Sequence, residues 1–316
     1  MTVRTEATVL HRPSDAALRF LPEGPYPLGP SRISWVAIQH GADATSGSLN
    51  ILDLASGENS NYPLPGRPGF AFPCDDGARF LVGCEREIGL FHPPSGDWQL
   101  LIDGIDADVE GTIINDAVIF EDDLIFGTKD LEFATRKAGL YLYRGRDKKL
   151  IRLRDDQICS NGKAIRQAPH GLELIDIDSP TRKIVAYPLD IERGKLGEPH
   201  TVVDLTSDSS APDGAILTPD GGGVIVSMYN PGAAPAGETR EYSLRDGCMR
   251  RVWLTPGAPQ NTCPNLVQHE GRVQLVITTA VEHMPVERQS DAPQSGCLFI
   301  APTEFDSVGT APAYPP

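Results

Sequence analysis

The sequence predicts an all-β fold, a six-bladed β-propeller formed by a single domain over residues 1–316. Six segments repeat one layout: a short β run, a polar turn, a second β run ending in an aromatic residue or Leu, and a turn rich in Gly, Asp or Ser. Their starts recur at roughly 45 to 50 residues, which is the repeat of a four-stranded propeller blade. No segment has a sustained apolar period of 3.6 residues, so we expect little helix.

The repeats account for nearly the whole chain. They lie at residues 34–57, 79–96, 123–147, 172–194, 223–247 and 273–302, and turn-opened strands such as GFAFPCDDGARF complete each blade. The clearest hairpin is APDGAILTPDGGGVIVSMYN, in which two β runs flank a Pro-Asp-Gly turn. We expect the β-like ATVL near the N-terminus to complete the last blade. The final segment, APTEFDSVGTAPAYPP, is interpreted as a closing strand followed by a loose, Pro-rich tail.

Composition excludes several classes of function. A formal net charge of -15 argues against a nucleic-acid or anionic-membrane partner, because a phosphate backbone requires a basic face. No apolar run of about 18 residues is present, so no transmembrane helix is expected. The N-terminus lacks the apolar core of a signal peptide, which indicates a cytoplasmic protein. The acidic stretch around Asp103, Asp106, Asp108 and Glu110 is interpreted as a solvated loop. The expected partner is a small molecule, with the protein a monomer or a weak homo-oligomer.

One oxygen-bearing side chain stands near a strand entrance in four of the repeats. These residues are Glu23 in Glu-Gly-Pro, Asn115 in Asn-Asp, Asn161 in Ser-Asn-Gly and Asp213 in Pro-Asp-Gly. Each tripeptide has an ordinary alternative, since Asn-Gly and Asp-Gly favour tight turns and a Glu in a Pro- and Gly-rich loop is usually exposed. Their occurrence in order, one per repeat, favours a ring of oxygen ligands. Carboxylates and an amide oxygen suit Ca²⁺, Mg²⁺ or Mn²⁺.

These motifs, in this order, resemble the regucalcin–gluconolactonase family, which includes luciferin-regenerating enzyme and is related to diisopropylfluorophosphatase. The resemblance covers nearly the whole chain. It implies a six-bladed propeller with one divalent cation at the mouth of the central channel, Ca²⁺ being preferred and Mg²⁺, Mn²⁺ or Zn²⁺ the alternatives. It also implies that Glu23, Asn161 and Asp213 bind the metal and that Asp213 is the catalytic base. Asn115 would orient the substrate or occupy a more distant coordination position.

The sequence departs from the family pattern around the substrate. Sugar-lactone members tend to carry an Arg two residues before the third-blade Asn, where this chain has Ile113. After Gly127-Thr128 the chain reads Lys-Asp-Leu-Glu-Phe in place of small residues, and we expect Lys129 and Glu132 to contact the substrate. The resulting hypothesis is a metal-dependent hydrolase that uses an activated water on a sugar lactone, a less polar lactone or an ester. A non-catalytic calcium- or ligand-binding propeller and a phosphotriester hydrolase are the alternatives.

Overall fold

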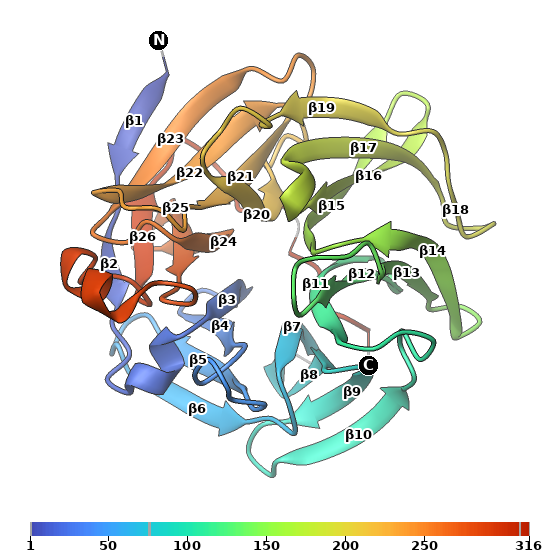
Figure 1. The fold of residues 1–316 in the computed structure, drawn as a ribbon, viewed down its shortest axis with the longest axis horizontal. Helices are drawn as coiled ribbons and strands as arrows, with labels where there is room; N and C mark the ends of the chain where they lie inside the picture. Colours follow the sequence, from blue (N-terminus) through green and yellow to red (C-terminus); the bar gives the residue numbers. More distant parts are fainter. Residues whose placement is uncertain (1, 75–76, 310, 316) are drawn as a thin grey trace.

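The structure, a computed structural model, describes residues 2–74, 77–309 and 311–315. In this part of the chain, six antiparallel sheets stand around one central axis, as the propeller prediction required (Figure 1). Each sheet is one blade, and its first strand in the chain lies innermost, beside the axis, apart from the two N-terminal strands, which join the outer edges of the last two blades. The only helical elements described are three short 3-10 segments, η1 (Ala16–Arg19), η3 (Ser179–Thr181) and η4 (Val286–Asp291). The all-β, six-bladed prediction is therefore confirmed.

The strands fall into blades in chain order. Blade 1 contains β3 (Pro22–Leu28), β4 (Arg32–Ala37), β5 (Ser48–Asp53) and β6 (Asn59–Pro63). Blade 2 contains β7 (Pro68–Cys74), β8 (Arg79–Cys84), β9 (Glu87–His92) and β10 (Asp97–Ile102). Blade 3 contains β11 (Thr112–Phe120), β12 (Asp123–Asp130), β13 (Ala138–Arg144) and β14 (Lys149–Gln157).

The second half of the ring follows the same plan. Blade 4 contains β15 (Ser160–Ala168), β16 (Gly171–Asp178), β17 (Lys183–Asp190), β18 (Lys195–Leu196) and β19 (His200–Asp204). Blade 5 contains β20 (Ala211–Leu217), β21 (Gly223–Tyr229), β22 (Ala236–Ser243) and β23 (Met249–Pro256). Blade 6 contains β24 (Asn261–His269), β25 (Arg272–Thr279) and β26 (Leu298–Pro302).

The N-terminal segment closes the ring. Strand β2 (Thr8–His11) pairs antiparallel with β26 and supplies the outer strand of blade 6, as expected from the ATVL run. Strand β1 (Val3–Glu6) pairs in parallel with β23 of blade 5. Strands from the two ends of the chain therefore share one sheet, so that unfolding the last blade requires both ends to detach.

All six innermost strands are bulged near their starts. The register with the second strand shifts between Glu23 and Tyr26 in β3, between Ile114 and Ala117 in β11, and between Pro212 and Ala215 in β20. Equivalent shifts occur in the other three: β7 after Pro68, β15 after Asn161 and β24 after Asn261. A β-bulge bends the strand and redirects side chains. The bulges form a ring at one end of the channel, which we call the mouth.

The C-terminal tail is not loose, contrary to the sequence interpretation. Tyr314 is buried in the cluster formed with blades 2 and 3, and its backbone N–H donates to Pro73 O at 2.9 Å. Tyr26 Oη donates to Pro312 O at 2.7 Å. The tail lines the end of the channel opposite the mouth. A cavity of about 570 Å³ extends along the channel from the bulges, where Gly24 and Asp116 line it, to the tail residues 308, 309, 311 and 312. The Pro-rich composition concealed the one buried aromatic anchor, Tyr314.

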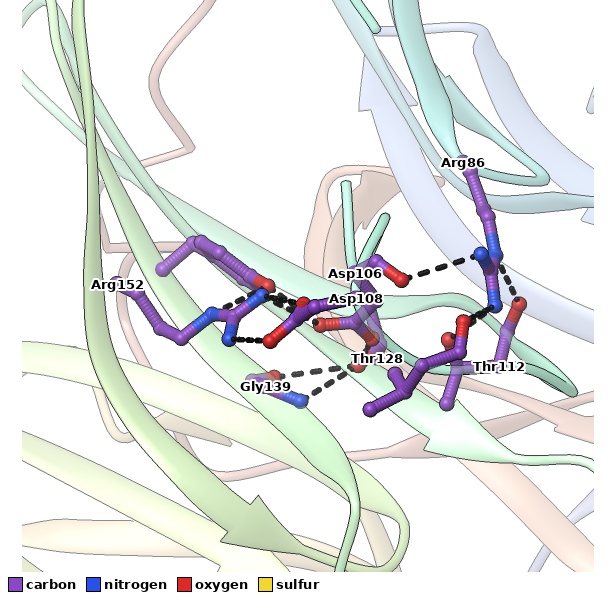
Figure 2. A network of polar contacts seen from close by, with 9 residues as sticks. Arg86, Asp106, Asp108, Thr112, Thr128, Gly139 and Arg152 are labelled. Atoms are coloured by element: carbon purple, nitrogen blue, oxygen red, sulfur yellow. Dashed lines mark hydrogen bonds and ion pairs between the residues drawn. The ribbon is translucent and has the colours of Figure 1, made fainter. Parts of the chain in front are cut away.

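The acidic loop between blades 2 and 3 is also only partly solvated. Asp106 is buried and accepts hydrogen bonds from Thr128 Oγ1 and Tyr141 Oη, whereas Asp103, Asp108 and Glu110 are exposed. Arg152 binds Asp108, and Arg86 donates to Thr112 and to the loop carbonyls (Figure 2). The loop is thus tied to two blades. None of the helices in the described residues is long and apolar enough to cross a membrane.

Candidate metal and substrate site

The four residues singled out from the sequence lie together at the mouth. Glu23, Asn115, Asn161 and Asp213 belong to four different innermost strands, and all are buried, with exposed fractions of 4% to 9%. Each stands at the bulge of its strand. They are therefore strand residues aimed by bulges, and the tight-turn alternative is wrong for Asn161 and Asp213.

Close packing at the axis explains why a glycine follows Asp213. A Cβ added at Gly214 would lie 2.6 Å from Cys263 Sγ and 2.8 Å from the Thr262 carbonyl oxygen of the next blade. Both distances are too short for a real side chain, so neighbouring innermost strands can approach this closely only at glycine. Blade packing therefore imposes the glycine of this Asp-Gly pair. In the sequence alone, such a glycine looks the same as one that forms a turn.

A chain of hydrogen bonds connects blades 3, 4 and 5 at the mouth. Asn115 Nδ2 donates to Asn161 Oδ1 and to Ser160 O, both at 2.8 Å. Asn161 Nδ2 donates to Ser179 Oγ at 2.8 Å, and Ser179 Oγ donates to Pro212 O at 2.6 Å, next to Asp213. Ser179 therefore holds the amide nitrogen of Asn161, and the amide oxygen of Asn161 faces Asn115. Ser179, on η3, was missed by sequence reasoning.

Three carboxylates interact at the mouth. Burial raises the pKa of Glu23 well above its ordinary value, and the nearby carboxylates of Asp116 and Asp213 raise it further. Burial and then Asp116 likewise raise the pKa of Asp213. Burial raises the pKa of Asp116 to about 6, against the opposing effect of Lys163 and Lys129. Asp116 lies in the bulge directly after Asn115, and although the Asn-Asp motif was recognised, the role of its Asp was not.

Lys129 is the cation of this group. It is directly opposite Ile113 in the β11–β12 ladder, and only 7% of the residue is exposed. Its charge lowers the pKa values of Glu23 and Asp213. Within the described residues Lys129 Nζ has no hydrogen bond or ion pair, and it lies 5.9 Å from the ring centroid of Phe133. A buried, unpaired ammonium is costly, so this one is suited to a ligand oxygen.

The donor set fits a divalent cation. In residues 2–74, 77–309 and 311–315, no group of three or more His, Cys, Asp or Glu side chains could hold a metal by itself. The candidate set instead combines the carboxylates of Glu23 and Asp213 with the oriented amide oxygen of Asn161. The carboxylates at the mouth outnumber the ammonium of Lys129, and burial, followed by the charges of neighbouring carboxylates, raises their pKa values. Hard oxygen donors and excess negative charge match Ca²⁺ or Mg²⁺.

Glu132 is placed differently from the other predicted residues. It lies on the exposed loop 131–137, where its backbone N–H donates to Asp130 Oδ1 at 3.2 Å. No contact found among the described residues brings its carboxylate to the mouth. Its substrate role stays a prediction, whereas its neighbour Phe133 reaches the mouth beside Lys129.

The fold and the site together define a six-bladed propeller with an oxygen-lined mouth. The chain matches the SMP-30/gluconolactonase/LRE-like region over residues 21–281 and belongs to that family. It is 35% identical over 107 residues to an uncharacterized protein of Sulfolobus acidocaldarius, covering 34% of this chain and 38% of that protein. It is 27% identical over 188 residues to a putative sugar lactone lactonase, YvrE, of Bacillus subtilis, covering 59% and 60%. The matches therefore span less than two thirds of either relative.

Among solved structures, the regucalcin of Agrobacterium tumefaciens, a calcium-binding protein, superposes with a TM-score of 0.80 at 21% identity. The superposition covers 99% of each chain. At this identity the likeness concerns the fold, and it extends to every blade.

Proposed function

We propose that the protein is a divalent-cation-dependent hydrolase that opens lactones of low polarity. The observation that carries the proposal is the group of interacting carboxylates, Glu23, Asp116 and Asp213, beside the oriented amide of Asn161 and the unpaired ammonium of Lys129. Membership of the gluconolactonase-like family supports lactone hydrolysis as the reaction class. Calcium is the preferred cation, because the donors are oxygen atoms.

Glu23, Asn161 and Asp213 would hold the cation. When bound, a divalent cation polarises a carbonyl and acidifies water. Asp213 accepts a proton from the attacking water and returns it to the ring oxygen as the acyl–oxygen bond breaks, so that lactone and water give a hydroxy acid. Lys129 Nζ donates a hydrogen bond to the carbonyl oxygen, which becomes anionic as the water adds.

The apolar side chain of Ile113 favours a substrate with few hydroxyl groups. Ile113 is 2% exposed and stands where an Arg would contact sugar oxygens by the family resemblance. A cavity of about 500 Å³ between blades 2 and 3 is lined by Ile113 and Leu131 together with charged residues, among them Arg67, Glu85 and Arg86. Arg67 is engaged by Glu85 at 2.7 Å, which leaves Lys129 as the available cation.

The test compares two acidic residues at saturating metal. Glu23→Gln should weaken metal binding and recover its rate with added calcium, because Glu23 acts through its charge on the ion. Asp213→Asn should stay slow by about 10²–10⁴-fold at saturating calcium, because an amide cannot accept the proton. Asp43→Asn, at an exposed position, is the control.

Rates are measured with a pH indicator on aliphatic, aromatic and sugar lactones, and calcium affinity is measured separately by calorimetry. Full recovery of Asp213→Asn with calcium would remove Asp213 from the base role. If the wild-type protein opens no lactone with any divalent cation but binds calcium, the hydrolase proposal fails and a calcium-binding propeller is favoured.

A further inference from the structure

Two aromatic side chains meet across the mouth of the channel. The ring centroids of Phe133 and His283 are 5.8 Å apart, and the rings are nearly perpendicular at 84°. Phe133 lies on the loop after β12 of blade 3, and His283 on the loop after β25 of blade 6. These blades face each other in the ring of six (Figure 1). A contact between them must therefore pass over the channel, and we call this pair the aromatic bar.

The aromatic bar lies above the candidate site. Strands β12 and β25 run antiparallel to the innermost strands, with Asp130 opposite Thr112 and Thr279 opposite Asn261. Both loops therefore emerge at the end of the channel where the bulges lie. Lys129 lies between the aromatic bar and the candidate site. Its Nζ is 5.9 Å from the centroid of the Phe133 ring, and its charge acts on the carboxylates of Glu23 and Asp213.

The loop that carries Phe133 is held by a buried carboxylate. Asp130 is completely buried and accepts hydrogen bonds from the backbone N–H groups of Ala134 and Thr135 at 3.0 and 2.9 Å. Lys137 Nζ lies 3.0 Å from its other oxygen. The backbone N–H of Phe133 donates to Asp130 O at 3.0 Å. With so many contacts to one residue, the loop backbone that carries Phe133 is fixed.

The loop that carries His283 is held from the opposite side. The backbone N–H groups of Val281 and Glu282 both donate to Phe20 O, at 3.0 and 3.1 Å. The carbonyl of Glu282 accepts a hydrogen bond from Tyr229 Oη at 2.7 Å. The Tyr229 ring is also perpendicular to the His283 ring, at a centroid distance of 6.5 Å. A second aromatic ring thus supports the bar on the blade 5 side.

Both residues of the bar have left-handed backbone conformations. The φ angle is +51° at Phe133 and +60° at His283. For Phe this conformation is an outlier that costs free energy and persists only where the surroundings enforce it, whereas His adopts it more readily. Folding alone would be served better by Gly or Asn at position 133. An aromatic residue at this strained position points to a role for the Phe133 ring.

We propose that the aromatic bar selects the substrate, favouring a lactone with a flat, apolar ring that packs against Phe133 while an oxygen of the ligand contacts Lys129. This specificity role rests on the proposed function. Aromatic faces attract flat apolar rings, whereas a polyhydroxylated sugar would have to give up hydration of its hydroxyl groups against the same surface. The imidazole of His283 and the ring of Tyr229 extend this aromatic surface.

The test measures binding of two hydrolysis products, so that it does not depend on turnover. The probes are 3-(2-hydroxyphenyl)propanoate, from the aromatic lactone dihydrocoumarin, and gluconate, from gluconolactone. Their affinities for the full-length, calcium-loaded protein are measured by calorimetry for wild type, Phe133→Ala and Phe133→Tyr. Val286→Ala is the control. Val286 is an exposed apolar residue on the stretch between β25 and β26, which also carries His283.

Phe133→Ala should weaken binding of the aromatic probe by about tenfold, in line with the loss of one aromatic contact. Phe133→Tyr should retain affinity, and Val286→Ala should bind like wild type. Gluconate should bind more weakly than the aromatic probe and be unaffected by Phe133→Ala. Equal affinity of Phe133→Ala and wild type for the aromatic probe, no binding of that probe by wild type, or an equal loss for gluconate would overturn the proposal. The expected pattern in a protein that opens no lactone would refute the hydrolase and leave the aromatic bar as a ligand-binding feature.

Discussion

Removing the charge of Lys163 should destabilise blade 4 strongly. The side chains of Lys163 and Asp176 are 0% and 1% exposed, and Lys163 Nζ lies 3.0 Å from Asp176 Oδ1. Lys163 Nζ also donates to Ser160 Oγ and Asn161 O, at 2.5 and 2.7 Å, while Gln157 Nε2 donates to the other oxygen of Asp176. Lys163→Met leaves the carboxylate buried with one hydrogen-bond donor. Breaking a buried pair from one side costs about 3–5 kcal/mol.

That cost corresponds to a fall in melting temperature of roughly 5–8 °C for a chain of this size. Thermal unfolding of wild type and Lys163→Met, followed by circular dichroism and calorimetry, measures it. The double variant Lys163→Met/Asp176→Leu removes both charges and should recover much of the loss. Arg193→Met is the control, because the Arg193–Asp190 pair is exposed and worth about 1 kcal/mol at most. A loss below about 1 kcal/mol for Lys163→Met, or a double variant no better than the single one, would refute the reasoning.

Two further predictions concern the mouth. Asp130→Ala should release the loop that follows it and lower the free energy of unfolding by about 2–4 kcal/mol, because several backbone donors lose their acceptor. Hydrogen exchange of that loop is the measurement, and unchanged protection would contradict it. Calcium affinity should rise with pH, because the proposed ligands Glu23 and Asp213 have raised pKa values and must lose protons to bind the cation. A raised carboxyl pKa stabilises the fold fully only below the unfolded value near 4, so metal-free protein should lose stability as pH rises through about 6. Calorimetry at pH 5 and 7 measures the calcium affinity, and thermal melts with and without EDTA at the same pH values measure the stability. A calcium affinity independent of pH would contradict the prediction.

Local patterns in the sequence were sufficient to predict the blades. The two β runs that follow Asp213 predict the β20–β21 hairpin, and the structure has it at the expected place. The weak β run at the N-terminus was sufficient to predict the closing strand β2, because a propeller closed in this way has one outer strand position left in its last blade. Both inferences depend on hydrogen bonding within one repeat or on the closure of the ring. They do not require knowledge of which distant side chains meet.

The features missed from the sequence all depend on distant contacts. Phe133 and His283 are far apart in the chain, and nothing local to either residue indicates the other. Tyr314 lies in a Pro-rich tail whose composition suggests disorder, yet its ring packs beneath blades 2 and 3. The pKa of Asp116 is set by burial and by lysines on two other strands, so the residue looked like an ordinary neighbour of Asn115. Tertiary environment, which decides these properties, leaves little trace in local composition.

A comparison between blades shows which residues at the mouth are required by packing and which are not. Gly214 is required because a Cβ there would meet the next blade, and Gly69 of blade 2 is required for the same reason, since its Cβ would lie 2.4 Å from Asn115 O. In blade 2, however, the residue before that glycine is Pro68, which carries no side-chain oxygen. Closing the ring therefore needs the glycine and does not need an oxygen donor before it. The carboxylate of Asp213 has no such packing explanation, and its buried position among other carboxylates is costly to the fold. Binding of a cation and a substrate at this site would offset that cost.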